Sequence, residues 1–154
     1  LYLQILAMLI VTTALVALAN VMLAALPQVG GAPLTLERML GWIFSPLVWL
    51  LGVPWSQAAT AGELMGIKLA LYELVAYLRL AAMPAGSLDP RSTQIMVYAL
   101  CGFANLGSVG ILIGGMNALI PERRDEVVSL APKALAAGTM ASALSGAMIG
   151  LLPL

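Results

Sequence analysis

Residues 92–120 read STQIMVYALCGFANLGSVGILIGGMNALI and contain no charged side chain, but their middle, GFANLGSVG at 102–110, is rich in glycine. A glycine inside a helix costs about 1 kcal/mol relative to alanine, so the glycines weaken any helix at this point. Asn105 and Ser108 lie among them and need hydrogen-bond partners when buried. We predict a discontinuous transmembrane helix over residues 92–120, interrupted near its centre.

The composition of the whole chain indicates a lipid environment. Of its 154 residues, 62% are apolar and 9% are charged, and the mean hydropathy is +1.02. Soluble proteins carry roughly 25% charged residues because water must hydrate their surface. The seven basic and seven acidic residues cancel, and the chain has no histidine, so it lacks both a basic field for nucleic acid and the commonest metal ligand. We expect an integral membrane protein, which excludes a soluble nucleic-acid-binding protein and a protein built around a zinc site.

Further helical segments lie on both sides of this stretch. Residues 1–26 are uncharged and, at about 1.5 Å per residue, extend over about 39 Å, which exceeds the roughly 30 Å of a bilayer core. Residues 27–55 begin with PQVGGAP, which ends that helix, and continue with three tryptophans, which predict a loop followed by an interfacial helix. After a loop at PERRDE (121–126), residues 127–152 are predicted to form the last span.

Residues 56–80 combine a helix-forming composition with charged side chains. These are Glu63, Lys68, Glu73 and Arg79. A charge at the centre of a bilayer costs about 2.5 to 3.5 kcal/mol, so such side chains must face protein or water. We therefore predict a re-entrant helical hairpin over residues 56–80, packed against neighbouring helices.

Glu73, within LYELVAYL, is the most informative of these charges, because a buried acid needs a hydrogen-bond partner, a cation or a proton. We interpret it as a candidate ligand residue, and the alternative is a structural ion pair with Lys68. These two residues lie five apart, whereas residues on one helix face lie three or four apart, so the pair requires a helix break. Glu63 and Arg79 lie near the segment ends and are expected to reach the interface.

Phe103, Asn105 and Ser108 are the candidate ligand residues of the interrupted helix. Taken alone, Asn105 is equally consistent with a plain hydrogen bond between helices, which is common in membrane bundles. The surrounding glycines and the aromatic ring of Phe103 favour a small polar ligand with a flat face. An intramembrane hydrolase is disfavoured, because Ser108 has no histidine to act as its base.

Small residues recur at a spacing of four in the last two segments. They are Gly110 and Gly114 in the first segment and Gly138, Ser142, Gly146 and Gly150 in the second. Small residues at this spacing let helices pack closely, and we expect them to serve packing. They also leave open an alternative function, a non-transporting membrane scaffold that assembles through these faces.

Three spans and one hairpin make an odd count of crossings. Transporters built from inverted repeats use halves of odd topology, so that the second half inserts upside down relative to the first. We find no repeat within the 154 residues, and the chain begins with Leu1, so we expect an upstream partner half. The predicted fold class is an all-α integral membrane protein with three transmembrane helices, an interfacial helix and one re-entrant helical hairpin, forming half of an inverted-repeat transporter.

The order of four motifs resembles the concentrative nucleoside transporters, a family of cation-coupled nucleoside importers. The motifs are GVPW (52–55), GIK (66–68) followed by ELVAY (73–77), YALCGFANLGSVGILIGG (98–115) and PERR (121–124). The resemblance covers nearly the whole chain. It implies a homotrimer of the inner or plasma membrane that works by alternating access, with residues 1–26 as a scaffold helix and residues 56–80 as the second hairpin.

The resemblance also implies a substrate site. A nucleoside would lie at the membrane midplane, with its ribose at Glu73, Asn105 and Ser108 and its base against Phe103. The resemblance implies no cofactor besides a coupling cation, Na⁺ or H⁺. The cation site is expected in the missing N-terminal half.

Two positions depart from the family pattern near the hairpin tip. Tyr72 stands where the family usually has asparagine, and Ile67 stands where it usually has threonine. The local hydrogen bonding of the tip, and with it the substrate preference, is expected to differ accordingly.

Overall fold

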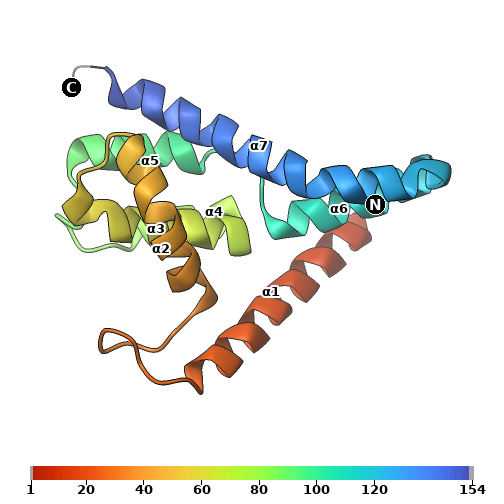
Figure 1. Ribbon diagram of the computed structural model, residues 1–154, viewed down its shortest axis with the longest axis horizontal. Coiled ribbons are helices and arrows are strands. Elements are labelled where there is room, and N and C mark those ends of the chain that lie inside the picture. The colour runs from red at the N-terminus through yellow and green to blue at the C-terminus, as the bar shows by residue number, and fades with distance from the viewer. Residues whose placement is uncertain (1, 153–154) are drawn as a thin grey trace.

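The computed structural model describes residues 2–152, and the regular elements in that range are all helices. They are α1 (Tyr2–Ala24), α2 (Leu36–Leu50), α3 (Trp55–Ala70), α4 (Glu73–Ala81), α5 (Pro90–Leu100), α6 (Leu106–Leu119), the short 3-10 helix η1 (Pro121–Arg123) and α7 (Arg124–Gly150). The predicted all-helical class is confirmed. In Figure 1, α7 runs the length of the molecule, α2 to α5 gather along one half of it, and α1 leads away from the other half beside α6.

Helices α2 and α3 pack backbone to backbone through glycines. A Cβ atom on Gly62 would lie 2.9 Å from the Ser45 amide nitrogen, and one on Gly66 would lie 2.6 Å from the Glu37 carbonyl oxygen. Small residues allow this approach because any side chain there would meet the backbone of the other helix. The sequence between residues 36 and 70 therefore forms one tightly packed pair of helices.

The core lies where α5 packs against α3 and α7. Its largest fully buried apolar side chains on α3 and α5 are Leu64, Met65, Ile95, Met96 and Leu100. A Cβ atom on Gly146 of α7 would lie 2.8 Å from the Ile95 carbonyl oxygen, so the small-residue face of α7 packs on α5 within the chain. By contrast, a Cβ atom on Gly114 would meet nothing within 4 Å in the described part of the chain, so the packing predicted for Gly114 is not seen there.

Polar groups tie α1 to the start of α2. The Asn20 amide donates to both carboxylate oxygens of Glu37, at 3.1 and 3.0 Å, and the Leu36 amide donates to Asn20 Oδ1 at 2.8 Å. The Arg38 guanidinium donates to loop carbonyls of Val29, Ala32 and Pro33. The charges at the start of α2 therefore hold the connection between the two helices in place.

Asp89 fixes the beginning of α5. Its Oδ1 accepts a hydrogen bond from the Ser92 amide at 2.6 Å, and the Gln57 side chain donates to its Oδ2 at 3.1 Å. Aspartate is among the preferred N-cap residues because its oxygen satisfies an unpaired amide of the first turn. The bond from the Ser92 amide holds the pKa of Asp89 below its usual range.

The loop predicted at residues 121–126 is wrong, because the chain is helical there. Pro121–Arg123 form η1, and α7 begins at Arg124. Proline is favoured at the first helical position, and acidic side chains stabilise a helix N-terminus, so PERRDE carries both helix-start signals. Among the described residues, η1 and α7 together (Pro121–Gly150) are long and apolar enough to cross a membrane, and Leu106–Leu119 and the Thr13–Ala24 part of α1 are shorter apolar stretches.

Candidate functional site

The first part of the candidate site is the turn between α3 and α4. The helix α3 ends at Ala70, Leu71 and extended Tyr72 form the turn, and Glu73 begins α4. A carboxylate in the first turn of a helix is favoured by the helix dipole. Glu73 is partly buried, and its Oε2 atom is buried without a hydrogen-bond partner among the described residues.

The second part is the interruption between α5 and α6. Asn105 is 5% exposed and caps α6, because its Oδ1 accepts a hydrogen bond from the Ser108 amide at 2.8 Å. The Ser108 hydroxyl lies 2.8 Å from the same oxygen and also reaches the Phe103 carbonyl, although its one proton serves one acceptor at a time. From the sequence, Asn105 was predicted either to bind a ligand or to bond to another helix. Its role as the cap of its own helix was not predicted.

The ring of Phe103 lies outside this closed group of hydrogen bonds. Phe103 is 78% exposed, whereas Asn105 is buried. The Asn105 Nδ2 atom donates no hydrogen bond within residues 2–152. The interruption therefore presents an exposed aromatic ring and an unused amide donor beside a satisfied helix cap.

A buried lysine joins the two parts. Lys68, in the last turn of α3, is 1% exposed and donates to the Ala99 carbonyl at 2.9 Å and to the Ser142 hydroxyl at 2.5 Å. A Cβ atom on Gly102 would lie 3.5 Å from the Lys68 Nζ atom, so the glycine at the interruption leaves space beside the ammonium. Lys68 thus connects the hairpin to the C-terminal end of α5 and to α7.

The charges of the hairpin do not form the ion pair that the sequence left as an alternative for Glu73. Within the described residues, the ion pairs with a nitrogen–oxygen distance up to 4.0 Å are Arg79–Glu63 at 3.9 Å and an exposed pair between Arg123 of η1 and Glu126 of α7. Lys68 and Glu73 do not approach each other within this distance. Glu63 and Arg79, which were expected to reach the interface, lie opposite each other across α3 and α4.

Tyr72 lies on the side of the turn that faces α1. It lines a cavity of about 390 Å³ together with four residues of α1, namely Ile10, Thr13, Ala14 and Ala17. Tyr72 therefore lies between the turn and α1.

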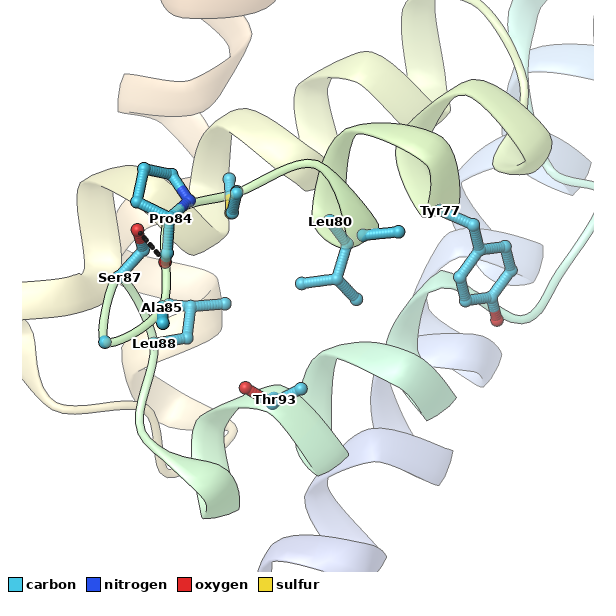
Figure 2. Close-up of a pocket in the computed structure, with 10 residues that line it drawn as sticks. Tyr77, Leu80, Pro84, Ala85, Ser87, Leu88 and Thr93 are labelled. Carbon is cyan, nitrogen blue, oxygen red and sulfur yellow. Dashed lines mark hydrogen bonds between the residues drawn. The ribbon is translucent and has the colours of Figure 1, made fainter.

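A larger cavity of about 510 Å³ lies between the end of α4 and the start of α5. Figure 2 shows Tyr77 and Leu80 on one side, Thr93 on the other, and the Pro84–Leu88 linker closing one end. The Tyr77 hydroxyl donates to the Val97 carbonyl at 2.6 Å. Most of this lining is apolar, and none of the predicted ligand residues belongs to it.

An all-helical chain in which polar groups gather at two interrupted helices is typical of membrane transporters with broken helices. The sequence profile described as "Na+ dependent nucleoside transporter C-terminus" matches residues 1–150, and the chain belongs to this family. This confirms the resemblance drawn from the motifs, and it makes the chain part of a membrane protein.

Individual relatives agree with the family match. The chain is 45% identical over 122 residues to the nucleoside permease NupC of Helicobacter pylori, covering 77% of the chain and 29% of the permease. It is 38% identical over 133 residues to solute carrier family 28 member 3 of Mus musculus, covering 77% of the chain and 19% of the carrier. The chain therefore spans less than a third of the length of these two relatives.

Solved structures of the transporter CNTnw share the fold. A variant in an intermediate state gives a TM-score of 0.87 at 40% identity, covering 97% of the chain and 38% of that structure. The inward-facing substrate-bound state gives a TM-score of 0.80 at the same identity, with 97% and 37% covered.

Proposed function

We propose that this chain is the C-terminal part of a cation-coupled nucleoside importer that works by alternating access. The observation that carries the proposal is the family match over residues 1–150. Its relatives are named as nucleoside permeases, and CNTnw has been solved in substrate-bound and intermediate states. The coupling cation is Na⁺ or H⁺, and the location is the cell membrane, with several spans and a homotrimeric assembly.

Within this proposal, Glu73, Asn105, Ser108 and Phe103 form half of the nucleoside site. The unpaired Glu73 oxygen accepts hydrogen bonds from ribose hydroxyl groups, and the unused Asn105 amide donates to a ribose oxygen. The exposed ring of Phe103 packs against the flat base. Ser108 joins by turning its hydroxyl from the Phe103 carbonyl to the substrate.

The coupling cation is proposed to bind outside these residues. The cation site, like the remaining contacts to the base, is assigned to the half of the transporter that pairs with this chain.

For the small-residue face of α7, the packing disfavours the scaffold alternative. Its small-residue face is occupied within the chain, since Gly146 and Gly150 both lie against Ile95 of α5. A face already covered by α5 is not free to assemble with a partner protein. These contacts between α7 and α5 also hold in place the first half of the interrupted helix.

Uptake by reconstituted protein tests the proposed function. Proteoliposomes with the complete transporter that contains this chain are expected to accumulate labelled uridine when an inward Na⁺ or H⁺ gradient is imposed. Proteoliposomes with the 154-residue chain alone are not, because the substrate of an inverted-repeat carrier binds between two halves. Gradient-driven accumulation by the 154 residues alone would contradict the two-half architecture, and no accumulation by the complete protein would contradict nucleoside transport.

A substitution at Asn105 separates its role as a helix cap from its role in substrate binding. Serine caps helices about as well as asparagine but has no amide donor, so Asn105→Ser is expected to change stability by less than about 0.5 kcal/mol. The same change should weaken uridine binding by about fivefold, which corresponds to one lost neutral hydrogen bond. The measurements are thermal unfolding and equilibrium binding in detergent. Unchanged binding by Asn105→Ser would leave Asn105 with only its capping role.

A further inference from the structure

The structure buries one charge completely. Of the described residues that are buried, Lys68 is the only charged one, and its side chain is 1% exposed. Burying an ammonium group costs several kcal/mol unless hydrogen bonds and an opposite charge compensate it. A lysine retained in such a place must therefore be offset by groups around it.

The hydrogen bonds of Lys68 offset only part of the free-energy cost of burying its charge. The ammonium group has three donors, and two of them bond to the neutral Ala99 carbonyl and Ser142 hydroxyl. Lys68 also lies in the last turn of α3 and beside the last carbonyls of α5, where the dipoles of both helices favour a positive charge. Among the described residues, the third donor of the ammonium group has no acceptor.

Glu73 is the acidic side chain that lacks a partner in the same region. Its Oε2 atom is buried without a partner among the described residues, and Glu73 begins α4 just across the turn from Lys68 in the last turn of α3. The two side chains lie too far apart for an ion pair within 4.0 Å. Lys68 is the buried cation among the described residues, and it lies on the other side of the α3–α4 turn from Glu73. Its position makes it the candidate counter-charge for the Glu73 carboxylate.

We propose that Lys68 is a positioning residue for nucleoside binding. Its charge compensates the Glu73 carboxylate, so that Glu73 can accept substrate hydroxyl groups away from bulk water. The inference rests on the proposed function, because it gives Lys68 its role through the ligand residue Glu73. It adds a functional residue that does not touch the substrate.

A double-mutant cycle in the complete transporter tests this role. Lys68→Met keeps the length and packing of the side chain but removes its charge, and it is expected to weaken equilibrium binding of uridine at least about tenfold. In a Glu73→Gln background the same change should weaken binding by less than about threefold, because the charge it compensates is gone. Equal effects in both backgrounds would overturn the proposal, since a lysine that only supports the fold acts independently of Glu73.

A second variant keeps the test decisive when Lys68→Met does not fold. Ser142→Ala removes one hydrogen bond of Lys68 and leaves its charge, so it should weaken binding by about threefold or less. A tenfold loss in Ser142→Ala would show that the packing position of Lys68 matters and not its charge, which overturns the proposal. Folding of each variant is followed by thermal unfolding.

The outcomes separate this inference from the proposed function. When Glu73→Gln weakens binding and Lys68→Met does not, only the role of Lys68 fails. When Glu73→Gln itself leaves uridine binding unchanged, the assignment of the nucleoside site fails first.

Discussion

Glu73→Gln is expected to weaken uridine binding at least tenfold in the complete transporter. Hydrogen bonds to a charged acceptor contribute about 1.5 to 3 kcal/mol, and they gain strength in a site that excludes water. Glutamine keeps the size of the side chain but replaces a charged acceptor with a neutral amide. The buried and unpaired Oε2 atom of Glu73 is the group that loses this capacity. Equilibrium binding of labelled uridine to detergent-solubilised protein measures the effect.

Glu63→Gln is the matched control for this substitution. Glu63 lies on the same hairpin, but its carboxylate faces Arg79 at 3.9 Å and is partly exposed, so the pair contributes little. Uridine binding by Glu63→Gln should stay within about twofold of the unmodified protein, since an exposed pair is worth about 0 to 1 kcal/mol. Equal losses in both variants would contradict a specific role of Glu73, and loss of folding in Glu73→Gln alone would indicate a structural role.

The sequence carries a clear local signal for one of the two interruptions. Glycines around Asn105 weaken a helix, and the structure places the end of α5 and the start of α6 on either side of residues 101–105. The turn at Leu71 and Tyr72 carries no such signal, because LALYELVAY is composed of residues that suit a continuous helix. Extended backbone at Tyr72 separates α3 from α4, and the flanking sequence alone does not locate that change.

The role of Lys68 could not be predicted, because its partners lie far away in the sequence. It bonds a backbone carbonyl 31 residues away and a serine 74 residues away. A backbone carbonyl has no side-chain signature, and Ser142 belongs to a series of small residues that indicated only packing. The cap at Asn105 is different, since asparagine is a preferred N-cap residue and the signal for it was present in the sequence.

The sequence also contains a helix-start signal just before α7, but the many charged residues there led to the prediction of a loop. Adjacent Arg123 and Arg124 and the neighbouring acidic side chains are typical of an exposed loop. Pro121 at a first helical position, with acidic residues in the following turn, instead favours a helix start. Charge density alone therefore did not separate a polar loop from the polar first turn of a long helix.

The contact between α2 and α3 predicts a large loss of stability on adding a single methyl group. In Gly66→Ala the new Cβ atom would lie 2.6 Å from the Glu37 carbonyl oxygen and 3.1 Å from the Gly41 amide nitrogen. Both neighbours are backbone atoms inside a helix, so neither can turn away as a flexible side chain would. Glu37 also binds Asn20 of α1, so a shift of α2 disturbs the connection to α1 as well.

We expect Gly66→Ala to destabilise the complete transporter by about 2 to 3 kcal/mol or more, the range of overpacking in tightly packed interiors. Thermal unfolding in detergent should show a Tm lower by about 4 °C or more, taking about 2 °C per kcal/mol, the low end of the range for domains of 150 to 250 residues. Gly114→Ala is the matched control, because its new Cβ atom meets nothing within 4 Å among the described residues and alanine favours the helix. Its Tm should be unchanged or slightly higher. A Tm for Gly66→Ala equal to that of Gly114→Ala would contradict the close approach of α2 and α3, and with it the rigid support that this pair gives to the turn carrying Glu73.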